Sequence, residues 1–379
     1  MQVKTLHGNF NFKMQRYRQG KDNFTYFELT EQLGQGYTTP RLKEYSAYYS
    51  NRMSYVDVEQ LLQRNQGEKI LSDQGIWDIV TNQAEVVSEQ ITEEVKQILA
   101  GHESEKLRVN SEIDIYDSQQ AEILIFDDGI QVKGQRQNRH SRRSESTTKC
   151  LSSEEYAKTP RVNTDVVILQ KSTGGFEHII APLANQEKTR PRLVDVVKAK
   201  VIQEYGDQDS PLNIVAITDG ARNIRLRLLS IFVNAVVIIL DWYHLGKKIR
   251  ELMSMIAHNK QEKSEHLRFL FSHLWRGKIE TVIDYLQHQV RPRNKEKLEE
   301  LIQYLQKHQH EIIDYERRQK AGKTIGSGRM EKGVDRVVGY RQKKKGMSWC
   351  SVGSHALAIL KVVELNGQWR QLWFSNAAA

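Results

Sequence analysis

The chain has 379 residues, of which 39% are hydrophobic and 27% charged, a composition that suits a globular protein of two or three domains. It contains no apolar run of about 18 residues and begins without the apolar stretch of a signal peptide. We therefore expect no membrane association and a cytoplasmic location. The two cysteines, Cys150 and Cys350, form no CxxC pair and are expected to be reduced thiols.

Charge is distributed unevenly along the chain. Residues 1–120 hold 13 Lys and Arg against 18 Asp and Glu, whereas residues 121–379 hold 43 against 29, so the second part accounts for the net charge of +9. Phosphate neutralisation and counterion release favour binding of such a region to a polyanion. Ribosomal and membrane-surface proteins share this property, so charge alone leaves the partner open.

Short strands and then helices are expected before residue 120. Residues 1–35 alternate apolar and polar side chains, as in a β-hairpin region. Ser54 and Asp57 form a capping-box pattern at the start of one helix, Gly67 ends it, and Asp73 opens another. Helix, turn and helix indicate either a DNA-binding helix-turn-helix or an ordinary helical hairpin, and the acidic balance of this stretch adds weight to the hairpin.

A mixed α/β sheet is expected from residue 121 onward. An amphipathic helix over 193–202 and a polar, basic loop over 136–161 interrupt the strand signals. Strands are expected, in chain order, at residues 121–128, 130–135, 165–170, 176–183, 213–219 and 234–241. This alternation of strands and helices is that of an RNase H-like core.

The remainder of the chain is predicted to be helical. Apolar residues recur at helical spacing from Leu245 to about residue 320, and Gly277 and Pro292 punctuate the pattern. The predicted organisation has four parts: a β-hairpin and helical DNA-binding region (1–120), the first part of the RNase H-like core (121–244), an all-helical insertion (245–322), and the last part of the core with C-terminal helices (323–379).

Three scattered carboxylates are candidates for phosphodiester chemistry. Such chemistry needs two divalent cations about 3.5–4 Å apart, which hard carboxylate oxygens hold. Asp128 and Asp219 are expected at the carboxyl ends of strands, each followed by glycine, although Asp127 is an alternative to Asp128. Glu331 is expected one turn into a helix that starts near Ser327, with Asp335 as its competitor.

Basic side chains surround Glu331 in the sequence. A cationic wall of this kind suits a DNA backbone. The expected DNA-binding residues are Arg329, Lys332, Arg336, Arg341, Lys343, Lys344 and Lys345.

The order of four motifs carries a family resemblance. DDG, TDGARNI, DWYHL and GSGRMEKGVDRVVGYRQKKKGMSW follow one another within roughly residues 40–365. This order resembles that of ISKra-type bacterial insertion-sequence transposases, relatives of the Mutator superfamily. Members of that family often have more sequence upstream, so a truncated N-terminal DNA-binding part is an open alternative.

The resemblance implies a DDE transposase with a helical insertion between the second aspartate and the glutamate. Asp128, Asp219 and Glu331 would be the catalytic residues and the ligands of two Mg²⁺ ions, which Mn²⁺ can replace. The DWYH element implies that Asp241 and His244 line the site, while an N-cap role for Asp241 is an equal alternative.

The implied reaction is DNA cleavage at the element's ends followed by strand transfer. The expected partners are the terminal inverted repeats and target DNA, and joining two ends implies a homo-oligomer on DNA. A catalytically inactive or domesticated DNA-binding relative, and an RNase H-like nuclease without strand transfer, are the alternatives.

Overall fold

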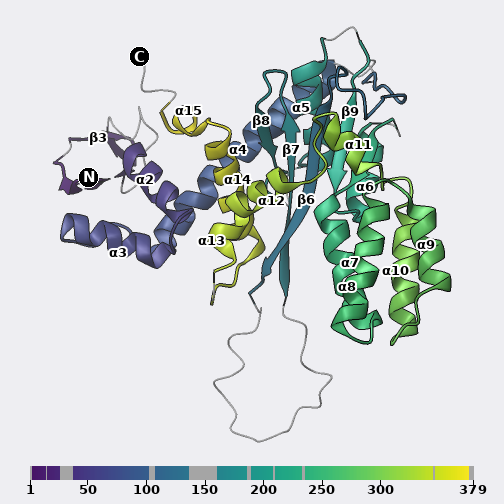
Figure 1. The fold of residues 1–379 in the computed structure, drawn as a ribbon. Coiled ribbons are helices and arrows are strands. Elements are labelled where there is room, and N and C mark those ends of the chain that lie inside the picture. Colours follow the sequence, from purple (N-terminus) through teal and green to yellow (C-terminus); the bar gives the residue numbers. More distant parts are fainter. Residues whose placement is uncertain are drawn as a thin grey trace, which may run out of the picture.

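A five-stranded mixed sheet forms the centre of the molecule (Figure 1). The computed structural model describes residues 2–13, 15–25, 37–101, 107–135, 160–185, 189–207, 210–232, 235–344 and 346–374. The strands lie in the spatial order β10-β9-β6-β7-β8. Their bounds are β6 (Ile123–Lys133), β7 (Arg161–Gln170), β8 (Phe176–Ile179), β9 (Ile214–Thr218) and β10 (Val237–Leu240).

Strand direction divides this sheet into two halves. β6, β7 and β8 are antiparallel neighbours, whereas β9 and β10 run parallel to β6. The prediction of a strand break at Gly129 was wrong, because β6 is one continuous strand. Pairing with β7 continues through this point, and Gly129 lies opposite Asp165. A Cβ on Gly129 would lie 2.7 Å from Asp165 Oδ1, so the glycine allows this close approach.

Helices cover both faces of the sheet. Alternate side chains of β6 and β9 point to opposite faces, where they join two separate hydrophobic clusters. On one face, Ile125 and Ala216 pack against α5 (Leu193–Tyr205) and α6 (Arg222–Ile231). On the other, Phe126 and Ile217 belong to the larger cluster, to which the helices after β10 contribute.

Residues 242–320 form the predicted helical segment, which lies beside the β9–β10 side of the sheet (Figure 1). Its apolar residues at helical spacing, Leu245, Ile249, Leu252 and Ile256, are buried as the periodicity predicts. The helices are α7 (Trp242–Ile256), α8 (Lys260–Leu274), α9 (Ile279–His288), α10 (Lys295–Lys307) and α11 (Tyr315–Lys320). Of the described helices, none has both the length and the apolar composition needed to cross a membrane.

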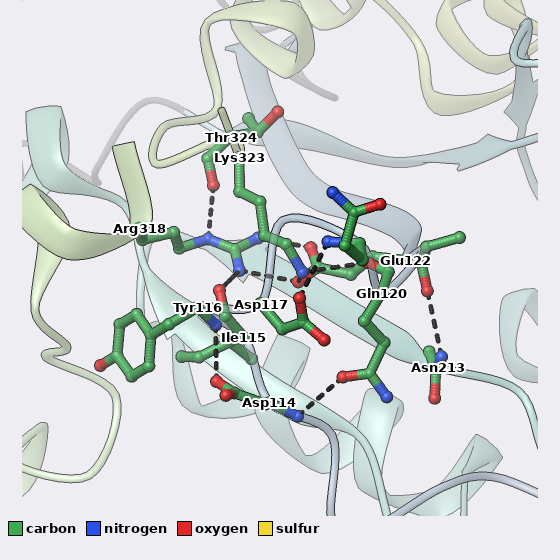
Figure 2. A network of polar contacts seen from close by, with 12 residues as sticks. Asp114, Ile115, Tyr116, Asp117, Gln120, Glu122, Asn213, Arg318, Lys323 and Thr324 are labelled. Carbon is green, nitrogen blue, oxygen red and sulfur yellow. Dashed lines mark hydrogen bonds and ion pairs between the residues drawn. The ribbon is translucent and has the colours of Figure 1, made fainter. Parts of the chain in front are cut away.

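A buried ion pair fastens the end of this helical segment to the chain just before β6 (Figure 2). The guanidinium of Arg318, fully buried, donates to both carboxylate oxygens of Glu122 at 3.0 and 2.7 Å. It also donates to the carbonyls of Ile115 and Thr324, and Lys323 Nζ donates to Glu122 at 2.6 Å. The network fixes where the chain leaves α11 and turns back toward the sheet.

The C-terminal helices return to the sheet. Successive turns over 328–342 carry the chain across β6 and β7, and the next helix packs on β7 and β8. The elements are α12 (Gly328–Val334), a π-helical turn η2 (Asp335–Gly339), α13 (Tyr340–Gln342), α14 (Ser351–Leu365) and α15 (Trp369–Phe374).

The N-terminal region combines small sheets with three helices at the β8 side of the molecule (Figure 1). The predicted capping box of Ser54 and Asp57 is confirmed, and Gly67 ends that helix in the left-handed conformation. The elements are β1 (Gln2–Thr5), β2 (Gly8–Asn11), β3 (Arg16–Gln19), β4 (Asp22–Thr25), β5 (Tyr37–Thr38), α2 (Pro40–Ser50), α3 (Tyr55–Gln66) and α4 (Asp73–Gly101).

The second helix of the expected helix-turn-helix is α4, which is 29 residues long. It packs against α2, α3, α5 and α14, and its buried residues from Ile76 to Val95 contribute to all three hydrophobic clusters. Residues of α4 that remain exposed include Asp73 and Asp78. α4 therefore packs as a core helix along its length, and DNA binding by this helical pair stays a prediction.

Candidate active site

The register of the parallel strands brings three aspartates to one level of the sheet. Thr218, the last residue of β9, pairs with Asp127 of β6 on one side and with Leu240 of β10 on the other. The residues that follow these three are Asp219, Asp128 and Asp241. Asp219 and Asp241 directly follow the ends of their strands, as predicted, whereas Asp128 lies inside β6.

Strand alternation separates the two neighbouring aspartates of β6. Asp127 points to the face covered by α6, where it is 2% exposed and accepts two hydrogen bonds of 2.7 Å from Arg227. Arg227 also donates to Asp165 at 2.9 Å. Burial raises the pKa of Asp127, and the guanidinium of Arg227 opposes that rise. Both carboxylate oxygens of Asp127 are thus occupied by a structural ion pair. Asp128, the next residue of the strand, points to the other face of the sheet.

Electrostatics reveal which groups surround Asp128. Burial raises the pKa of its carboxyl, and the negative charges of Asp219 and Glu331 raise it further. The backbone amide of Gly129, which donates to Asp128 Oδ1 at 2.7 Å, and the nearby charge of His244 act in the opposite direction. Asp219 and Glu331, each more than 90 residues from Asp128 along the chain, are therefore near enough for their charges to act on Asp128.

Glu331 reaches this position on α12. The helix follows the N-cap Ser327, and Met330, Val334, Val337 and Val338 are buried, as the sequence pattern predicts. Gly333 allows the helix to lie directly on the sheet, because an added Cβ would collide with Ile168 of β7. Glu331 itself remains exposed.

Asp241 connects two parts of the site. It is fully buried, and as N-cap of α7 its Oδ1 accepts from the backbone amide of His244 at 2.7 Å, while Oδ2 accepts from that of Ser327. Burial raises its pKa, but the His244 side chain together with these hydrogen bonds outweighs burial, and the pKa is lowered. Asp241 therefore ties the end of β10 to the start of the helix that carries Glu331.

His244 lies beside the same acidic groups. Its Nδ1 is 3.5 Å from Asp241 Oδ1, an ion-pair distance without hydrogen-bond alignment. Its pKa is raised by Asp241 first, and the charges of Asp219 and Asp128 add to the effect, although burial opposes it. The raised pKa favours the protonated ring, whose positive charge would partly balance the negative charge of the site.

Divalent-metal binding requires hard oxygen ligands with free lone pairs. Asp128 and Asp219 each use Oδ1 on a backbone amide, of Gly129 and Ala221 respectively. The mutual repulsion that raises the pKa of Asp128 is what a bound cation would relieve. Within the part of the chain that the structure describes, however, no three His, Cys, Asp or Glu side chains stand at distances that would ligate one ion. Donor chemistry fits Mg²⁺, and the side chains would have to draw together around it.

The expected DNA-binding cations divide into two groups. Arg329, Lys332 and Arg336 are exposed on the helix of Glu331, and Lys343 and Lys344 are exposed beyond it. Lys345 lies outside the described residues, as do Cys150 and residues 136–159 of the expected loop.

The prediction that Arg341 lies on the surface was wrong, because its side chain is only 3% exposed. Its Nε donates to the carbonyl of Ser50 at 2.6 Å, and its guanidinium lies 4.7 Å from the ring of Trp349. Burial lowers its pKa. This side chain joins the last turns of the helix to α2 and is not available to a phosphate.

Several residues near the site gave no recognisable sequence signal. His308 and Glu311 follow α10, are buried, and form a 2.5 Å contact between His308 Nδ1 and Glu311 Oε2. Arg225 of α6 pairs with Glu311 at 3.1 Å. Gly220, at φ +83°, lets the ring of His308 approach, since a Cβ there would lie 2.7 Å from its Cε1. The helical segment thus braces the turn after Asp219.

Comparison of the chain with protein-family models and with curated proteins gave no match in either case.

Proposed function

We propose that this chain is a transposase of the DDE class, in which an RNase H-like core acts on DNA. The observation that carries the proposal is the strand register that places Asp128, Asp219 and Asp241 at one level of the sheet. The charges of Asp219 and Glu331, which raise the pKa of Asp128, agree with it. Strand order β10-β9-β6-β7-β8, with only β7 antiparallel to its two neighbours, supports an RNase H-like core. The motif order of the sequence supports the transposase assignment within that class.

In this proposal Asp128, Asp219 and Glu331 would hold two Mg²⁺ ions. When bound, the ions would supply Lewis-acid activation of the attacking oxygen and charge neutralisation at the leaving oxygen. The protein's own contribution is positioning: hydrogen-bonded strands fix Asp128 and the start of the turn at Asp219, and Asp241 fixes the beginning of the Glu331 helix.

The proposed reaction has two steps. Hydrolysis adds water across a phosphodiester at the element's end, leaving a 3′-hydroxyl and a 5′-phosphate. In strand transfer that hydroxyl bonds to a target phosphorus and displaces the target's own 3′-oxygen, which leaves as a hydroxyl. The number of phosphodiester bonds is conserved in the second step, so no nucleotide triphosphate is needed. Joining two ends requires more than one copy of the chain on DNA.

The test uses DNA that flanks the coding region as substrate. We expect Mg²⁺-dependent cleavage and, with pre-nicked ends, joining to target DNA. Asp219→Asn and Glu331→Gln should each reduce cleavage by at least about 10³-fold, whereas Asp335→Asn, an exposed carboxylate one turn later, should not. Cutting without joining would indicate a nuclease, and DNA binding without metal-dependent cutting would refute the enzyme.

A further inference from the structure

A pocket of about 350 Å³ lies between α12 and the strands β7 and β8. Ile168 and Phe176 provide its apolar side. Arg329, Lys332 and Arg336, which lie on the first turns of the helical stretch, provide a basic side. The volume lies in the range of about 300–1,000 Å³ that holds small-molecule groups. The pocket is therefore large enough for one nucleotide.

The basic side chains of this pocket lack acidic partners. No carboxylate is among the described residues that line it. No described residue forms an ion pair with Arg329, Lys332 or Arg336, whereas Arg227 and Arg318 elsewhere are held by carboxylates. Three cations brought together without an ion-pair partner among the described residues favour an anion from outside the chain.

The apolar side of the pocket includes an aromatic platform. The guanidinium carbon of Arg329 lies 4.0 Å from the centre of the Phe176 ring. Phe176 in turn packs against Phe126 of the core, with 6.2 Å between ring centres. Proteins that bind single-stranded nucleic acid combine such aromatic and guanidinium surfaces, on which bases stack, with cations that follow the phosphates.

We propose that this pocket binds one unstacked nucleotide of a single-stranded DNA segment, with its phosphate at Lys332 and Arg336 and its base on the Arg329–Phe176 platform. A duplex would touch only the rim, because its bases are stacked on one another. The inference rests on the proposed function for the identity of the strand. Glu331 belongs to the same helix as the pocket's cations. A nucleotide bound in the pocket would therefore hold the end of the DNA strand near the proposed catalytic carboxylates.

The experiment measures binding of a fluorescein-labelled oligothymidylate and of a labelled duplex by anisotropy, with EDTA present so that nothing is cleaved. We expect Phe176→Leu to weaken single-strand binding about tenfold. Arg336→Ala should weaken it and also lower the slope of log affinity against log salt by about 0.7. Lys307→Ala, which removes an exposed charge from α10, is the matched control and should leave both affinities unchanged.

Three results would overturn the inference. The first is native-like single-strand affinity in both Phe176→Leu and Arg336→Ala. The second is an equal loss of affinity for the duplex and for the single strand in these variants. The third is an equal loss of single-strand affinity in the control Lys307→Ala. Circular dichroism melts of Phe176→Leu check its fold, and Arg336→Ala changes an exposed side chain only. Metal-dependent cleavage by the native chain is measured separately. If the native chain cleaves DNA but the pocket variants bind single strands normally, only the nucleotide pocket is rejected. If the variants lose single-strand binding but the native chain does not cleave, only the transposase proposal is rejected.

Discussion

Replacing Asp241 with alanine should lower both the stability of this protein and the DNA cleavage that we propose for it. Loss of the α7 N-cap costs about 1 kcal/mol. The backbone amide of Ser327, a buried residue, would also lose its partner, at a cost of about 1–3 kcal/mol. The free energy of unfolding should therefore fall by about 2–4 kcal/mol, a substantial part of the 5–15 kcal/mol typical of a domain. Relief from burying the carboxylate does not cancel this loss, because its hydrogen bonds outweigh burial.

Urea unfolding followed by circular dichroism gives the stability change, and DNA cleavage is measured at a temperature where the variant is folded. Asp284→Ala is the matched control, since Asp284 is exposed and, among the residues that the structure describes, forms an ion pair only with the exposed His288; we expect a change within about 0.5 kcal/mol. Cleavage by Asp241→Ala should fall further than its folded fraction does, because Ser327 begins the helix of Glu331. A stability loss below about 0.5 kcal/mol together with native cleavage would refute the reasoning.

Two further substitutions test how the helical segment is attached. Arg318→Met should lower the unfolding free energy by about 3–5 kcal/mol in urea titrations, because Glu122 keeps only Lys323 as an ion-pair partner and the carbonyls of two residues, Ile115 and Thr324, lose their donor; a loss under about 1 kcal/mol would contradict this. Gly220→Ala combines about 1–2 kcal/mol of left-handed strain with a clash against His308. The same change at Gly174, which has a similar φ but open space around it, should cost only the strain, so equal thermal shifts for the two would reject the proposed bracing.

Much of the fold was predictable where one local pattern decides it. The helix from Ser327 onward could be placed because apolar residues recur at helical spacing, and the same holds for Leu245 to Ile256. The capping box at Ser54 specifies a helix start through two hydrogen bonds within four residues. These features depend on residues that are neighbours in the sequence, so they can be predicted without knowledge of the tertiary structure.

Other features depend on partners far along the chain. The register of β6 against β9 decides whether Asp127 or Asp128 lies on the same face as Asp219 and Glu331. Arg227, which forms the ion pair with Asp127, is 100 residues away in the sequence. Gly129 resembles a turn in isolation, yet pairing with β7 carries the strand through it. Arg341 lies in a basic run typical of a surface, but the carbonyl of Ser50 holds it inside the protein.

The most direct measurement of the central claim is Mn²⁺ binding, followed by water-proton relaxation in the presence of a duplex oligonucleotide. If Asp128, Asp219 and Glu331 act as one metal site, the native complex should bind Mn²⁺, and Asp128→Asn, Asp219→Asn and Glu331→Gln should each weaken binding strongly. Asp127→Asn, which changes the neighbouring carboxylate on the other face of β6, should bind Mn²⁺ as the native chain does. Equal Mn²⁺ affinity in the native chain and all three site variants would contradict the account.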